Sequence, residues 1–162
     1  VIEAKWLFDV DLSQIQVVVH PQSVIHSAVE YADGAVIAQL GTPDMRIPIQ
    51  YALYYPSRPA LSGDRLDLFK LKDLTFEAPD LDTFKGLALA MKAAGAGGNI
   101  PTAFNAANER AVALFLKKKI KYLEIIDIIE ACMENASFIE NPSVDEILDT
   151  EQCAYDYISK RW

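Results

Sequence analysis

The sequence predicts an α+β protein in which a small mixed sheet with a β-hairpin precedes a helical domain resembling a four-helix bundle. Three observations favour this class. Short runs rich in β-branched residues lie in the first 40 residues, an Asp-Gly pair separates two of these runs, and the pattern after Pro79 is helical throughout. With 162 residues, 51% of them hydrophobic, the chain is long enough to bury one core or two small ones.

The predicted sheet follows a short helical segment. Residues 1–8 place apolar side chains in a helical rhythm, and a polar stretch follows them. Gln16–His20 is a β-branched run stopped by Pro21, which is typical of a buried strand. Residues 24–31 and 35–40 flank Ala32-Asp33-Gly34, and Asp-Gly indicates a tight hairpin because glycine tolerates the positive φ of such turns. The sequence therefore predicts three strands.

A short helix is expected over residues 45–55, with Pro48 in the first turn, where its missing N–H costs little. Asp44 is expected to cap this helix, and Met45 to lie in the core. Residues 56–80 hold three prolines and one glycine, so they are interpreted as a linker that carries one short strand at 74–77.

Four amphipathic helices are predicted after the linker. Glycines follow the first, a lysine run closes the second, and a Ser-x-x-Glu capping box opens the fourth. The expected ranges are 82–94, 101–119 and 122–136, with the fourth helix beginning at Ser143. Short connections between such helices are typical of a small bundle.

The overall composition excludes several classes of protein. A formal net charge of −8 argues against a nucleic-acid surface, because phosphate binding needs clustered Lys and Arg. No apolar run approaches the ~18 residues of a membrane span, and no signal peptide is visible. Cys132 and Cys153 show no CxxC spacing and are expected to be reduced, buried thiols in a cytoplasmic protein.

Residues that could carry chemistry are few, and no phosphate loop, dinucleotide fingerprint, GxSxG or HExxH motif is present. His20 and His26 lie near strand ends and could be metal ligands or a base with its partner. Their spacing matches no common zinc pattern, so hydrogen-bonded structural histidines are favoured. Glu3 could bind a divalent cation or be a surface charge. Asn105 and Asn108 are expected to make structural polar contacts, because Asn is a poor helix former.

One octapeptide is unusually specific: His20-Pro21-Gln22-Ser23-Val24-Ile25-His26-Ser27. Further specific segments, in order, are 2–8, 33–34, 38–41, 43–49, 74–80 and 104–109. Together they resemble the 1-deoxy-D-xylulose 5-phosphate reductoisomerase family of non-mevalonate isoprenoid biosynthesis, and the resemblance covers essentially the whole chain.

The resemblance implies an oxidoreductase that also isomerises its substrate. Members of the family convert the sugar phosphate 1-deoxy-D-xylulose 5-phosphate to 2-C-methyl-D-erythritol 4-phosphate, using NADPH and Mg²⁺ or Mn²⁺, and they are homodimers. Residues 1–55 then correspond to the second half of the catalytic and dimerisation domain, 56–80 to a linker, and 81–162 to the C-terminal helical domain. A homodimer through the sheet is expected, with no nucleic-acid or membrane partner.

The resemblance also assigns site residues. His26 matches a histidine near the active site, Pro43 and Met45 match residues bordering substrate and nicotinamide, and Glu3 matches a carboxylate close to the metal. No complete catalytic set and no cofactor-binding residue is matched. The chain starts at Val1 within a helical rhythm, so it is expected to be the carboxy-terminal part of a longer enzyme. By itself it is expected to be inactive and to bind neither NADPH nor a cation tightly. The alternative is a free-standing helical interaction module whose hairpin pairs with a partner.

Overall fold

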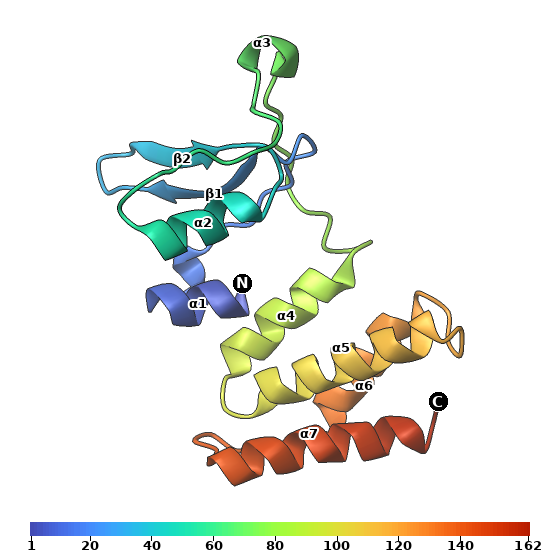
Figure 1. The fold of residues 1–162 in the computed structure, drawn as a ribbon. Coiled ribbons are helices and arrows are strands. Elements are labelled where there is room, and N and C mark those ends of the chain that lie inside the picture. The colour runs from blue at the N-terminus through green and yellow to red at the C-terminus, as the bar shows by residue number, and fades with distance from the viewer. The chain divides into compact units, whose positions relative to one another are not determined.

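The computed structural model describes all 162 residues and confirms the α+β class, with seven α-helices and a two-stranded antiparallel sheet (Figure 1). The chain forms two compact units. One, here called the sheet unit, is Val18–Ala78, and the other, the helical unit, combines Val1–Val17 with Pro79–Trp162. None of the helices combines the length and the apolar character that crossing a bilayer requires.

The hairpin of the sheet unit is confirmed. Strands β1 (Ile25–Glu30) and β2 (Val36–Leu40) pair antiparallel. In the turn between them, Gly34 has a φ of 84° and donates its N–H to Tyr31 O at 2.9 Å. The carboxylate of Asp33 accepts the Ala35 N–H at 2.9 Å. The Asp-Gly pair therefore makes the turn for the predicted reason, with the carboxylate satisfying a backbone group inside the loop.

The predicted third strand at Gln16–His20 is wrong, and so is the mixed sheet that depended on it. Val19 instead forms one isolated antiparallel bridge with Glu77, with both N–H···O distances at 2.9 Å. The predicted strand at 74–77 is reduced to the same bridge. The pairing does not extend because Pro21 has no N–H to donate, and because the side chains of His20 and Gln22 bind Thr75 directly.

The predicted helix after the hairpin is confirmed as α2 (Arg46–Tyr54), whose third residue is Pro48. Met45 is wrongly assigned to the core, since 64% of its surface is exposed. The linker contains a helical turn that the sequence interpretation missed, α3 (Leu68–Leu71). Asp67 caps α3 by accepting the N–H groups of Phe69 and Lys70, so an Asp N-cap was the signal available for finding it.

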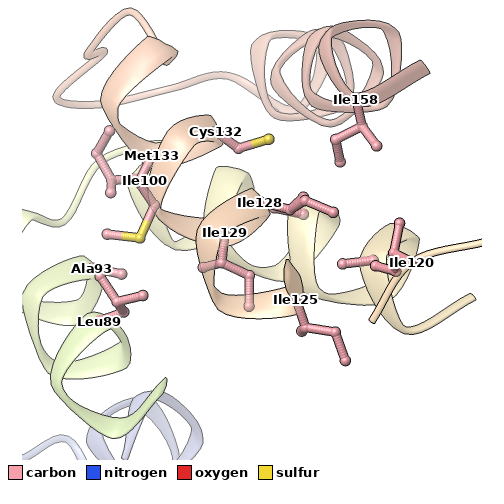
Figure 2. Close-up of a cluster of buried hydrophobic side chains, with 12 residues drawn as sticks. Leu89, Ala93, Ile100, Ile120, Ile125, Ile128, Ile129, Cys132, Met133 and Ile158 are labelled. Atoms are coloured by element: carbon pink, nitrogen blue, oxygen red, sulfur yellow. The ribbon is translucent and has the colours of Figure 1, made fainter. Parts of the chain in front are cut away.

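The helical unit contains the four predicted helices, α4 (Lys85–Ala96), α5 (Ile100–Leu116), α6 (Glu124–Asn135) and α7 (Val144–Ser159). Helix α5 packs against the other three. Their apolar faces meet in one core, in which Ile128 and Ile158 are fully buried. Figure 2 shows side chains of α4, α6 and α7 converging there. The short helix α1 (Ile2–Phe8) and the 3₁₀ turn η1 (Leu12–Gln14) pack on α4.

The polar residues that are buried in the helical unit are Asn99 and Thr150, not the predicted pair. Asn99 is only 1% exposed and binds three groups: its Nδ2 donates to Ser137 O and Thr150 Oγ1, and its Oδ1 accepts the Ile139 N–H. Asn105 is exposed, Asn108 is half-buried, and neither side chain makes a hydrogen bond within the chain. Helical phase explains the error, because the buried face of α5 is formed by alanines such as Ala103, Ala106 and Ala107.

The predicted capping box at the start of α7 is confirmed. Glu146 accepts hydrogen bonds from Ser143 N–H and Oγ, both at 2.8 Å, and donates its own N–H to Ser143 Oγ at 3.3 Å. We expect Ser143→Ala to lower the free energy of unfolding by about 1 kcal/mol in urea denaturation followed by circular dichroism. Ser159→Ala, at the other end of α7, is the control for losing a hydroxyl on the same helix.

The same box predicts a pH dependence. The hydrogen bonds from Ser143, backbone first, lower the pKa of Glu146. A carboxyl whose pKa falls on folding stabilises the protein above its unfolded pKa, and this contribution disappears as pH falls through the folded value. Glu146→Gln should therefore make stability less pH-dependent in that acidic window. An unchanged acid-unfolding profile would contradict the assignment.

The two cysteines differ, contrary to the prediction that both are buried. Cys132 is buried, and desolvation raises its pKa to about 11, whereas Cys153 is exposed on α7. Cys153 lies beside Ala154, which together with Thr150 and Ile158 forms the buried stripe, so helical phase turns it outward. At pH 8 only about one Cys132 in a thousand is a thiolate. We expect iodoacetamide to modify Cys153 well before Cys132 in native protein, by mass spectrometry; equal rates would contradict the burial of Cys132.

Candidate functional site

The structure distributes the predicted site residues between the two units. His26, Pro43 and Met45 lie in the sheet unit, and Glu3 lies exposed on α1 of the helical unit. His26 is exposed within β1, at a register shift between Ile25 and Ala28 where β1 has one residue more than β2. A bulge of this kind interrupts the pairing and re-aims the side chain that it contains.

The segment that carries Pro43 and Met45 is tightly folded between β2 and α2. Gly41 donates its N–H to Val24 O at 3.1 Å, which continues the hairpin, and Asp44 donates its N–H to Thr42 O at 2.7 Å. Asp44 was predicted to cap the next helix, but the N-cap of α2 is Met45, and no side chain caps the helix. Asp44 lies one residue before the N-cap, where its Oδ1 accepts the Arg46 N–H at 2.9 Å. Pro43 and Met45 are both exposed on either side of it.

Asp44 and Arg46 form an ion pair with short hydrogen bonds. The guanidinium Nε lies 2.9 Å and Nη2 2.6 Å from Asp44 Oδ2. These side-chain hydrogen bonds hold the pKa of Asp44 below its usual range and raise that of Arg46. Both groups therefore stay charged at neutral pH, and the pair is not suited to transferring a proton.

His20 has a structural role, as the sequence suggested. Its Nδ1 lies 2.8 Å from Thr75 O, and its ring stacks on Phe76 at a centroid distance of 4.8 Å. A carbonyl can only accept, so Nδ1 carries the proton; Nε2 is buried without a hydrogen-bond partner. Gln22 binds the same residue, donating Nε2 to Thr75 Oγ1 at 2.8 Å. The first part of the octapeptide therefore holds Thr75 and Phe76 in place within the sheet unit.

The residues of this chain do not by themselves form a metal centre. Nowhere do three His, Cys, Asp or Glu side chains come together in a geometry that could hold an ion. Mg²⁺ and Mn²⁺ prefer several oxygen ligands at once, and Glu3 is a single exposed carboxylate on a seven-residue helix. Glu3 alone therefore cannot hold a divalent cation in a fixed geometry.

A pocket of about 470 Å³ lies along α2 in the sheet unit, and sequence reasoning missed it. Gln39, Ile47, Pro48, Tyr51, Ala52, Tyr55 and Arg58 line it. The Arg58 guanidinium lies 3.7 Å from the centre of the Tyr51 ring, within cation–π range. The tyrosines at i and i+4 on a predicted helix were the available signal, but only the fold brings Gln39 and Arg58 beside them.

The comparison with known families decides the relationship. Residues 40–157 match the family model described as the DXP reductoisomerase C-terminal domain. The chain belongs to this family. The match covers the end of β2, α2, and helices α3 to α6 with nearly all of α7. Membership of a reductoisomerase family favours the enzyme interpretation over the helical interaction module.

Individual members of the DXP reductoisomerase family are similar over the whole chain. The 1-deoxy-D-xylulose 5-phosphate reductoisomerase of Agathobacter rectalis is 99% identical over 162 residues, and that of Lachnospira eligens is 60% identical. In both cases the alignment covers 100% of this chain and 43% of the relative. The chain thus spans less than half the length of these curated relatives.

Solved structures show the same relationship. A DOX-P reductoisomerase in complex with NADPH, fosmidomycin and magnesium has a TM-score of 0.91 and 44% identity, over 98% of this chain and 41% of that one. The reductoisomerase from Zymomonas mobilis in complex with NADPH has a TM-score of 0.89 and 42% identity, over 98% of this chain and 42% of that one. The fold described above is therefore the fold of this family.

Proposed function

We propose that this chain is the C-terminal portion of a 1-deoxy-D-xylulose 5-phosphate reductoisomerase, which converts its substrate to 2-C-methyl-D-erythritol 4-phosphate with NADPH and a divalent cation. The observation that carries the proposal is the 99% identity with the Agathobacter rectalis enzyme along the entire chain. The solved relatives that contain NADPH and magnesium support the two cofactors of the whole enzyme.

Within that enzyme, the sheet unit is proposed to border the active site. His26, Pro43 and Met45 are all exposed, so their side chains are available to a substrate or a nicotinamide ring. Glu3 is proposed to lie close to the cation as one peripheral carboxylate. None of these groups forms a catalytic set, and the 162 residues bring no three metal-ligating side chains together. The isolated chain is therefore proposed to be inactive and to bind neither NADPH nor a cation tightly.

The remaining parts have supporting roles in the proposal. Residues 1–55 are assigned to the catalytic and dimerisation domain, 56–80 to the connection and 81–162 to the helical domain of a cytoplasmic enzyme. The enzyme is proposed to be a homodimer through the sheet. Val36 and Ile37 of β2 are each 62% exposed, and the apolar strand surface they leave open supports such pairing. Neither a nucleic acid nor a membrane is proposed as a partner.

The test compares two proteins in the same assay. One is the isolated 162-residue chain, and the other is the Agathobacter rectalis enzyme with this chain as its C-terminal part. Each is given 1-deoxy-D-xylulose 5-phosphate, NADPH and Mn²⁺, and NADPH oxidation is followed by absorbance. We expect turnover by the long protein only. Activity of the isolated chain would refute its proposed incompleteness, and an inactive long protein would refute the assignment of the reaction.

A further inference from the structure

The carboxylate of Asp44 is bound entirely by one neighbour. Its two oxygens accept hydrogen bonds from the backbone N–H, Nε and Nη2 of Arg46, at distances between 2.6 and 3.0 Å. The pair is only two residues apart, so these bonds close a small ring that includes the backbone of Met45. Two groups of fixed geometry, a carboxylate and a planar guanidinium, set the direction of the chain at this point.

A second segment of the sheet unit lies against this pair. A Cβ added to Gly63 would be 3.1 Å from Arg46 Nη2 and 4.0 Å from Asp44 Oδ2, and Gly63 has a φ of +136°, which residues with side chains rarely adopt. Next to it, Thr42 Oγ1 donates to Asp64 O at 3.4 Å. The loop that contains Gly63 and Asp64 therefore binds the 42–46 segment through one hydrogen bond, and at Gly63 it leaves little room for a side chain beside Arg46.

The side chains of Pro43 and Met45 make no hydrogen bond or ion pair that anchors them. Both are exposed, and Met45 exposes 64% of its surface. Between them, the Asp44 N–H binds Thr42 O and its carbonyl accepts the Ile47 N–H at 3.1 Å, while the Met45 carbonyl accepts the Ile49 N–H at 3.2 Å. The direction in which the two side chains project is therefore set by this short stretch of backbone, which the pairing of Asp44 with Arg46 helps to hold.

We infer that Asp44, Arg46 and Gly63 form a clamp that positions Pro43 and Met45 for binding in the reductoisomerase active site. The inference rests on the proposed function, which places Pro43 and Met45 beside the substrate and the nicotinamide. In it Asp44 and Arg46 are positioning residues, because they act through their neighbours. Removing the clamp should raise the KM for substrate or NADPH more than it lowers kcat, because the displaced residues, Pro43 and Met45, are proposed to bind these molecules.

The experiment uses the full-length Agathobacter rectalis enzyme carrying this chain as its C-terminal part. Asp44→Asn, Arg46→Met and the double variant are compared with Met45→Ala. We expect each clamp variant to raise KM by about tenfold with a much smaller change in kcat. Because the two residues act as one unit, the double variant should cost little more than either single variant. Arg46→Lys keeps the charge but loses the bidentate hydrogen bonding to Asp44. Its KM should therefore lie between those of the unmodified enzyme and Arg46→Met.

Two further variants separate positioning from general stability. Lys70→Met breaks another exposed ion pair of the sheet unit, that of Lys70 with Asp67 at 3.8 Å, and should leave both KM values unchanged. Gly63→Ala disturbs the clamp without changing a charge and should raise the same KM as Arg46→Met. The melting temperature of every variant is recorded beside its kinetics, and Arg46→Lys provides the measurement if a harsher variant does not fold.

The outcomes distinguish this inference from the proposed function. If the unmodified enzyme does not oxidise NADPH with the substrate, the proposed function fails and the inference fails with it. If Met45→Ala raises a KM while the clamp variants leave it unchanged, only the inference is overturned. It is also overturned if the clamp variants lower the melting temperature without altering either KM, or if their effects on KM simply add.

Discussion

Replacing Gly98 with alanine is expected to lower the free energy of unfolding of the helical unit by about 3 kcal/mol. Gly98 has a φ of 54°, and a Cβ there would lie 2.2 Å from Ile139 O and 2.9 Å from a ring carbon of Phe138. Ile139 O cannot move freely away, because it accepts the Asn99 N–H at 3.1 Å. Conformational strain and steric overlap therefore add. Urea denaturation followed by the helical circular dichroism signal measures the loss.

Gly97 provides a comparison for this substitution. It also has a positive φ, 67°, but a Cβ at Gly97 would meet nothing within 4 Å. With a ψ of −153° its backbone lies in a region that is essentially restricted to glycine, so Gly97→Ala should cost backbone strain alone, about 2 kcal/mol. A loss for Gly98→Ala smaller than this strain would show that the close approach of the 137–139 segment does not restrict position 98.

Asn99→Ala is expected to lower the free energy of unfolding by about 3 kcal/mol as well. The Asn99 amide binds Ser137 O at 2.9 Å, Thr150 Oγ1 at 3.0 Å and the Ile139 N–H at 2.9 Å. Alanine leaves these groups without their partner in a buried place, where each unsatisfied group carries a desolvation cost. The measurement is again urea denaturation of the helical unit.

Asn105→Ala is the control, because Asn105 lies on the same helical segment but is exposed. Its replacement by a better helix former should leave the stability unchanged or slightly higher. Thr150→Val tests one branch of the network, since it removes only the hydroxyl that accepts from Asn99 and donates to Glu146 O at 2.7 Å. A loss for Asn99→Ala no larger than that for Asn105→Ala would contradict the role assigned to the buried amide.

Local patterns were sufficient to predict several elements. The hairpin follows from Asp33-Gly34, and the start of α7 follows from the Ser143–Glu146 capping box, because in each case the decisive hydrogen bonds lie within a few residues of one another. The strand predicted at Gln16–His20 failed for the opposite reason. A strand needs a partner, and the only partner of this segment is the backbone near Glu77, which pairs with it at one position.

The candidate site was predicted less completely than the fold. His26, Pro43 and Met45 were found through the resemblance to a family, and their roles remain predictions. The close approach of the Gly63 backbone to Arg46 was not visible in the sequence, and neither was the pocket lined by Gln39 and Arg58. Both depend on the course of the loop after α2, and prolines and a glycine without periodicity do not specify that course.

The sequence by itself determined the α+β class, the hairpin, the four helices of the helical unit and the family. These depend on periodicity, turn residues and short ordered motifs, which act locally along the chain. Only the tertiary structure decided that Asn99 is buried while Asn105 is exposed, that Cys153 faces solvent and that Gly98 lies against Ile139. Burial and close approach depend on which distant segment covers a residue, and the pattern of neighbouring residues does not predict which segment this is.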